Sequence, residues 1–178
     1  MIELHMGPVN SGKSRACEEI LKLNMQSKKM VVDLRYVNIK QTLYRISQDL
    51  PRYIHLIVHI KEAWLFNIER FMFLSELFKS NNYCMLLLDG IDFLHNRKPT
   101  ILETEIKYLV DRVVYHSALC KCGKEQTRYS RKLKGDMSID IEHEPEDSDL
   151  LYEGVCPKCY DRACLEMKGL ELECAGVR

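Results

Sequence analysis

Residues 7–14 of the chain read Gly-Pro-Val-Asn-Ser-Gly-Lys-Ser, which fits the pattern GxxxxGK[ST]. The alternating apolar run 1–6 precedes them, and a helical pattern follows. Gly7 and Gly12 permit backbone conformations that point consecutive N–H groups inward, and the helix that begins there adds the positive end of its dipole. The motif in this context predicts a phosphate-binding loop between the first strand and the first helix of an α/β fold.

Two positions of this loop have specific predicted roles. Lys13 is expected to reach the β- and γ-phosphates of a nucleotide, and the Ser14 hydroxyl is expected to ligate Mg²⁺. An ordinary strand-to-helix turn with two glycines is the alternative, and the complete pattern with both flanks argues against it. The predicted nucleotide-binding residues are Gly7, Pro8, Val9, Asn10, Ser11, Gly12, Lys13 and Ser14.

The length and charge of the chain exclude several classes of protein. Its 178 residues suit one α/β domain with a modest appendage. Lys plus Arg and Asp plus Glu both total 26, so no net field favours nucleic acid or an anionic membrane. No apolar run approaches the roughly 20 residues of a membrane span, and the first residues lack the layout of a secretory signal. We expect a soluble, cytoplasmic protein that binds neither nucleic acid nor a membrane.

Hydrophobic periodicity predicts alternating strands and helices after the loop. The predicted helices are 14–28, 67–78 with Asn67 as cap, and 99–111; the predicted strands are 30–37, 53–60, 83–88 and 113–119. Segment 38–52 is weakly patterned and contains the helix breaker Pro51. Repeated strand and helix units behind a phosphate loop predict a mostly parallel sheet covered by helices.

Two close pairs of cysteines, separated by 33 residues, indicate a ribbon-type Zn²⁺ site near the C-terminus. Thiolates one or two residues apart on a tight turn can occupy adjacent corners of a tetrahedron, which a second pair closes. The first pair is C-x-C, shorter than the usual C-x-x-C, and free thiols are the alternative. The predicted ligands are Cys120, Cys122, Cys156 and Cys159.

Four further cysteines lie outside these pairs. Cys164 and Cys174 are alternative candidates for one of the four zinc-ligand positions. Cys17 and Cys84 fall on the apolar faces of a helix and a strand, which favours small core residues. The acidic run 142–147 is expected to be a loop.

The order of these motifs resembles the type II thymidine kinases, which carry a zinc-bearing lasso domain. The loop is similar to that family's G-P-M-F-S-G-K-S, and segment 88–99 to its L-D-G-x-F-x-R-x-P-F element, with a small insertion. Strand 113–120 resembles V-x-x-L-x-A-x-C, segment 129–132 resembles x-T-x-R, and segment 152–159 matches the spacing Y-x-x-x-C-x-x-C.

The resemblance implies a fold, an activity and an assembly. It divides the chain into a P-loop nucleotide-binding α/β domain over 1–119, a zinc-binding lasso domain over 120–160 and a tail over 161–178. The implied enzyme uses ATP, Mg²⁺ and Zn²⁺, and transfers the γ-phosphoryl group to the 5′-hydroxyl of thymidine or a related deoxynucleoside. The family usually forms homotetramers, so a homo-oligomer is expected.

The acidic motif of the family, D-E-x-Q-F, falls on residues 61–66, where the match makes Glu62 the general base. Lys61 replaces the metal-associated aspartate and Trp64 the glutamine. A lysine there would weaken Mg²⁺ binding and, close to Glu62, lower the pKa of the glutamate. Three other carboxylates are rivals for the metal: Asp33, Asp89 and Asp92.

The nucleoside side of the resemblance rests on two aromatic residues. Phe93, from the L-D-G element, is the expected stacking partner of the base, and Tyr152 is the lasso tyrosine. Structural packing is the alternative role for each of them.

Two other functions compete with an active kinase. Lys61 favours a divergent homologue with weakened catalysis that serves as a sensor or structural subunit. A P-loop ATPase whose zinc ribbon contacts nucleic acid is the other alternative, and the neutral net charge argues against it.

Overall fold

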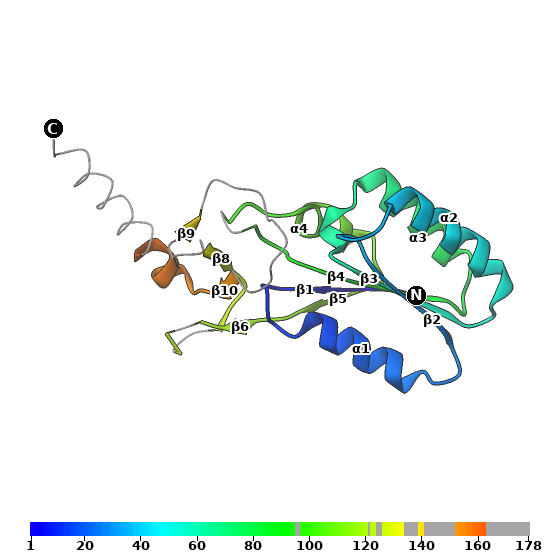
Figure 1. The fold of residues 1–178 in the computed structure, drawn as a ribbon, viewed down its shortest axis with the longest axis horizontal. Helices are drawn as coiled ribbons and strands as arrows, with labels where there is room; N and C mark the ends of the chain where they lie inside the picture. The colour runs from blue at the N-terminus through cyan, green and yellow to red at the C-terminus, as the bar shows by residue number, and fades with distance from the viewer. Residues whose placement is uncertain (95–96, 121, 124–125, 134–138, 141–151, 163–178) are drawn as a thin grey trace.

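The computed structural model describes residues 1–94, 97–120, 122–123, 126–133, 139–140 and 152–162. A central sheet of five parallel strands has the order β2-β3-β4-β1-β5 (Figure 1). Its strands are β1 (Ile2–Met6), β2 (Lys28–Asp33), β3 (Leu56–Lys61), β4 (Met85–Gly90) and β5 (Arg112–Tyr115). The prediction of a parallel sheet flanked by helices is confirmed.

Helices cover both faces of this sheet. α1 lies on one face, and α2 and α3 lie on the other (Figure 1). The α-helices are α1 (Lys13–Leu23), α2 (Ile39–Asp49), α3 (Ile68–Lys79) and α4 (Ile101–Thr104), and short 3-10 turns are η1 (Leu50–Arg52), η2 (Ala63–Leu65) and η3 (Ile106–Tyr108). The predicted helices at 14–28 and 67–78 are thus present, the first of them shorter.

The predictions for segments 38–52 and 99–111 differ from the structure. The weakly patterned segment 38–52 contains α2, which begins where the Asn38 side chain accepts a hydrogen bond from the backbone of Gln41 and buries Leu43 and Ile46. Pro51 ends this helix instead of preventing it. Segment 99–111 forms only α4 and η3, because the backbone at Glu105 leaves the helical region.

The strands alternate their side chains between the two faces. Even-numbered residues of β1, β3 and β4 belong to the large apolar core with α2 and α3, which includes Phe71, Leu74 and Phe78. Odd-numbered residues of the same strands face α1, where the apolar cluster is small. It contains Cys17, Leu21, Ile57 and Leu87. Cys17 and Cys84 are both buried, as predicted.

The C-terminal part adds two small antiparallel sheets. One pairs β6 (Ala118–Leu119) with β7 (Gln126–Thr127), and the other has the order β10 (Tyr152–Gly154), β8 (Ser130–Leu133), β9 (Ile139–Asp140). The domain boundary after residue 119 stays a prediction. The acidic run 142–147, Cys164 and Cys174 lie outside the described residues. In the described part, no helix combines the length and hydrophobicity that crossing a membrane requires.

Candidate active site and cysteine cluster

The loop between β1 and α1 depends on its two glycines. Gly12 precedes α1 with a left-handed φ of 84°, a conformation that glycine adopts without strain. At Gly7 a Cβ atom would lie 2.4 Å from the carbonyl oxygen of His116, so only glycine permits this close approach. Lys13 bends back over the loop, and its Nζ donates to the Pro8 carbonyl at 2.7 Å. The sequence therefore builds a tight loop that closes around the lysine.

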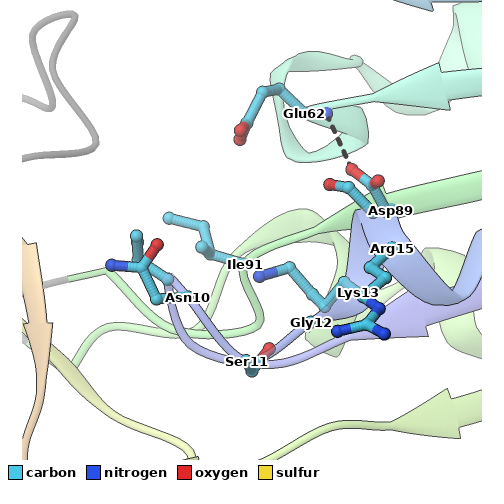
Figure 2. Close-up of a pocket in the computed structure, with 10 residues that line it drawn as sticks. Asn10, Ser11, Gly12, Lys13, Arg15, Glu62, Asp89 and Ile91 are labelled. Atoms are coloured by element: carbon cyan, nitrogen blue, oxygen red, sulfur yellow. Dashed lines mark hydrogen bonds between the residues drawn. The ribbon is translucent and has the colours of Figure 1, made fainter.

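A cavity of about 320 Å³ opens beside this loop. Figure 2 shows loop residues 10–13 on one side of the cavity and the side chains of Glu62 and Asp89 on the other. The lining residues come from the loop, the start of α1 and the ends of β3 and β4: Val9, Asn10, Ser11, Gly12, Lys13, Ser14, Arg15, Glu62, Asp89 and Ile91. Six of the eight predicted loop residues and the predicted base therefore meet in one cavity.

Asp89, at the end of β4, is a buried carboxylate with several hydrogen-bond donors. His59 Nε2 donates to its Oδ2 at 2.9 Å, and the Glu62 backbone N–H donates to its Oδ1 at 3.3 Å. Burial acts to raise the pKa of Asp89, but hydrogen bonds from His59 and Ser14 outweigh it, so the pKa lies below its ordinary value. The carboxylate is thus kept ionised beside the loop.

Glu62 follows β3 and projects its carboxylate into the same cavity. Its backbone has a left-handed φ of 57°, and the Trp64 indole Nε1 donates to its Oε2 at 2.6 Å. Burial is the main cause that raises the pKa of Glu62, while the Trp64 bond and the Arg35 charge act against it. A carboxylate that faces a cavity and has a raised pKa meets the requirements of a general base.

Lys61 does not lie in the cavity beside Glu62, where the metal-associated aspartate of the resembled family was expected. Its Nζ pairs with Glu18 Oε1 of α1 at 3.1 Å, and it is not among the lining residues of the cavity. Lys61 is not among the main causes that set the pKa of Glu62, which burial raises, so the lowering expected from a close Lys61 is not seen. The positive charge near Glu62 is instead Arg35, whose Nη1 lies 3.9 Å from Glu62 Oε1.

Arg35 was missed at the sequence level. It follows β2 and forms a short ion pair with Asp33, with Nη2 and Oδ2 2.8 Å apart, which lowers the pKa of that carboxyl. This pair occupies Asp33, and Asp92 is taken up by Arg128 at 2.7 Å. Among the three rival carboxylates, Asp89 alone lines the cavity. A rule that polar residues after parallel strands share one edge of the sheet would have grouped Arg35 with Glu62 and Asp89.

A second polar network lies behind the loop, on the face that α1 covers. His5 Nδ1 and His116 Nε2 are 2.8 Å apart, and His5 Nε2 is 2.9 Å from Glu3 Oε1. Burial lowers the pKa of both histidines. Because His116 also supplies the carbonyl against Gly7, this network supports the base of the loop.

The two predicted nucleoside contacts lie elsewhere. The Phe93 ring lies 5.1 Å from Tyr129 and 5.4 Å from the Arg128 guanidinium, and it is not among the residues that line the cavity. Tyr152 belongs to β10, and its side chain lies outside the described part of the structure. The stacking role of both residues stays a prediction.

The four cysteines of the two pairs come together, as the spacing predicted. Their four sulfur atoms all lie within 4.8 Å of one another, so the cluster could hold a metal ion. The residues are Cys120, Cys122, Cys156 and Cys159. Burial raises the pKa of the Cys120 thiol, but hydrogen bonds from its partner cysteines lower it to about 7. A thiol of this pKa is partly thiolate at neutral pH, which is the form that binds metals.

Comparison with known proteins gives one informative relative. The chain is 23% identical over 176 residues to a thymidine kinase of Raccoon poxvirus, an alignment that covers 89% of this chain and 96% of the viral protein. No protein-family model matches the chain. The similarity supports a distant relationship to thymidine kinases and a kinase function, at an identity that leaves the substrate open.

Proposed function

We propose that this protein is an ATP-dependent deoxynucleoside kinase that transfers the γ-phosphoryl group of ATP to the 5′-hydroxyl of thymidine or a close relative. One observation carries the proposal: loop residues 9–14, Glu62 and Asp89 line one cavity. The similarity to a thymidine kinase, over 89% of this chain, supports it. In this proposal the enzyme is cytoplasmic and forms a homo-oligomer.

The residues of the loop bind the triphosphate in this proposal. Backbone N–H groups of residues 9–14 bind the β- and γ-phosphates, and the Lys13 amine neutralises part of their charge. Lys13 would exchange its bond to the Pro8 carbonyl for phosphate oxygens. The main task of this site is to stabilise the negative charge that develops on the oxygens of the γ-phosphoryl group during transfer.

Asp89 serves the Mg²⁺ ion in this proposal, in place of the aspartate that Lys61 replaces. Its carboxylate is ionised and lies beside Ser14, whose hydroxyl is the other expected ligand. Mg²⁺ prefers oxygen ligands and is held by one or two protein groups plus the substrate phosphates. Asp89 and Ser14 fit that requirement, and His59 fixes the carboxylate from behind.

Glu62 accepts the proton of the nucleoside hydroxyl. Its raised pKa brings the carboxylate nearer to the operating pH, which favours proton transfer, and Trp64 holds one oxygen so that the other can face the substrate. The loop after β4 with Phe93 and the segment of residues 124–155 are proposed to enclose the nucleoside. The four-cysteine cluster would hold Zn²⁺ and fix that segment.

Phosphoryl transfer from labelled ATP to each deoxynucleoside, with Mg²⁺ present, tests the proposal. Thymidine is expected to be the preferred acceptor, and Glu62→Gln is expected to lower kcat by about 10²–10⁴-fold, the range for a lost acid–base group. Glu19→Gln, on the exposed side of α1, is the matched control and should leave kcat unchanged.

Lys61→Asp separates the active kinase from its alternative. Because Lys61 faces Glu18, this substitution should change kcat little. A wild-type protein without turnover that gains activity in Lys61→Asp would reject the active kinase and support a nucleotide-binding homologue with weakened catalysis.

A further inference from the structure

Three metal-binding side chains meet beneath the floor of the cavity. Cys17 comes from α1, His59 from β3 and Asp89 from β4, and one donor atom from each lies within 4.8 Å of the other two. All three side chains are buried, with exposed fractions of 0%, 0% and 2%. The cluster is separate in sequence and in donor type from the four cysteines of the C-terminal part.

The ring of His59 has unused bonding capacity. Its Nε2 is bonded to Asp89, but its Nδ1 is buried without a hydrogen-bond partner among the described residues. Buried polar atoms are nearly always satisfied, so an exception beside a thiol and a carboxylate calls for a ligand. The apolar neighbours Leu21, Ile57 and Leu87 supply no such partner.

We propose that Cys17, His59 and Asp89 form a binding site for a thiophilic divalent metal ion, Zn²⁺ or an ion of similar chemistry. Sulfur, imidazole and carboxylate donors are the set that Zn²⁺ takes, and three protein ligands leave a fourth position for water. Mg²⁺ does not suit a site with a sulfur donor, since it requires oxygen ligands. Burial raises the pKa of the Cys17 thiol, so the ion has to displace its proton; the resulting thiolate and the carboxylate balance the two positive charges.

The spacing of the donors suits such an ion. Metal–ligand distances of about 2.0–2.3 Å place tetrahedral donors roughly 3.3–3.8 Å apart. Donors that now lie within 4.8 Å of one another would need to approach by about 1.5 Å at most. Asp89 also lines the cavity, which gives the ion a route in from solvent.

The site would share Asp89 with the nucleotide. This consequence rests on the proposed function, in which Asp89 serves Mg²⁺. An ion held by Cys17 and His59 draws the same carboxylate away from Ser14, so thiophilic metal and Mg²⁺-nucleotide should exclude each other.

Titration with Co²⁺ tests the site directly, on the full-length protein loaded with a single equivalent of Zn²⁺, which the four thiolates of the C-terminal cluster take first. We expect one Co²⁺ per chain beyond the metal of the four-cysteine cluster, with a near-ultraviolet absorption band from a single thiolate–cobalt bond. Cys17→Ala should lose this ion and its band. Cys84→Ala is the matched control, because Cys84 is buried outside both clusters and should retain both.

His59→Gln provides a second variant that fills the space of the ring without its coordinating geometry, and it should also lose the ion. Thermal melting establishes that each variant is folded. A wild-type protein that binds no Co²⁺ beyond the cysteine cluster, or a folded Cys17→Ala that binds as much as wild type, would overturn the proposal.

Competition with nucleotide separates this site from the proposed function. In wild type, added Zn²⁺ should weaken Mg²⁺-ATP binding at least tenfold, and Cys17→Ala should remove that effect. If no nucleotide binds at all, the proposed function fails while the Co²⁺ result still decides the metal site. If Co²⁺ binds at Cys17 and nucleotide affinity does not change, the shared use of Asp89 is rejected.

Discussion

The two faces of the central sheet differ in what they bury. The face toward α2 and α3 is lined mainly by buried Leu, Ile, Val and Phe side chains. The face toward α1 carries a row of ionisable groups on the same strands: Glu3, His5, His59, Lys61 and Asp89. One face therefore supplies stability, and the other holds groups whose burial is unfavourable unless each is paired.

In the proposed function, this difference places the reacting groups on the face toward α1. Buried charges are retained where they are hydrogen-bonded, and Asp89 with its donors from His59, Ser14 and Glu62 is the best example. The polar row also ends at the loop before α1. We infer that substitutions on the α3 face change the free energy of unfolding, whereas those on the α1 face change activity first.

The largest expected effect is on the apolar face. Phe71→Ala should lower the free energy of unfolding by about 3–5 kcal/mol, because the side chain is fully buried and leaves a cavity. Denaturant unfolding measures the change. Phe73→Ala on the same helix is the matched control, since Phe73 is 46% exposed and should lose less than about 1 kcal/mol.

Asp89→Asn tests the polar face. In the proposed function it removes the charge that serves Mg²⁺, so kcat/KM should fall by about 10²–10³-fold, the range for one lost electrostatic contact. Steady-state kinetics at varied Mg²⁺ measures it, and the loss should be smaller at high Mg²⁺. A variant that unfolds as readily as Phe71→Ala while the folded fraction keeps full activity would contradict the division between the faces.

Metal removal tests the four-cysteine cluster, which belongs to neither face of the central sheet. A chelator should lower Tm by about 5–10 °C if the four-cysteine cluster holds zinc at 100-fold above its Kd. Differential scanning calorimetry records the shift, and Cys122→Ser should melt at the lower temperature without chelator. An unchanged Tm, with zinc shown to be removed, would mean that the cluster does not stabilise the fold.

The smallest effect concerns pH and the His5–His116 pair. Their 2.8 Å contact needs one neutral ring, and Glu3, Asp89, His59 and Lys13 are the other titratable groups that act on them. Both pKa values are lowered on folding, so this contribution to stability is complete above the unfolded value near 6.5. It is lost as the pH falls through the lowered folded values.

Thermal melting across that pH range measures the loss, and His116→Phe should flatten the dependence. His55→Gln is the control, because His55 is exposed and makes no contact with the pair. An identical pH dependence in wild type and His116→Phe would remove the pair as the cause.

The apolar face was also the predictable one. Short runs of apolar residues identified the central strands, and the GxxxxGK[ST] pattern located the loop, because both signals are local. The helix α2 was not predicted, because Pro51 is a helix breaker and the segment is only weakly patterned. Its apolar residues nevertheless repeat at helical spacing: Ile39, Leu43, Ile46 and Leu50.

The site was predictable only in part, since its contacts join distant strands. Glu62 could be assigned by its order in the chain, but the bonds from Trp64 and His59 and the approach of Arg35 depend on tertiary packing. The position of Lys61 shows the limit clearly. Adjacency in sequence placed its charge beside Glu62, whereas alternation along the strand turned it toward Glu18 on α1.

The left-handed backbone of Glu62 has a consequence for engineering. A residue with a side chain in this conformation is strained by about 1 kcal/mol, which glycine would relieve. Directed evolution scored by thermostability alone would therefore favour glycine at position 62. In the proposed function, the selected glycine variant would be more stable but would lack the general base. Screens of this protein therefore need to measure activity from the first round.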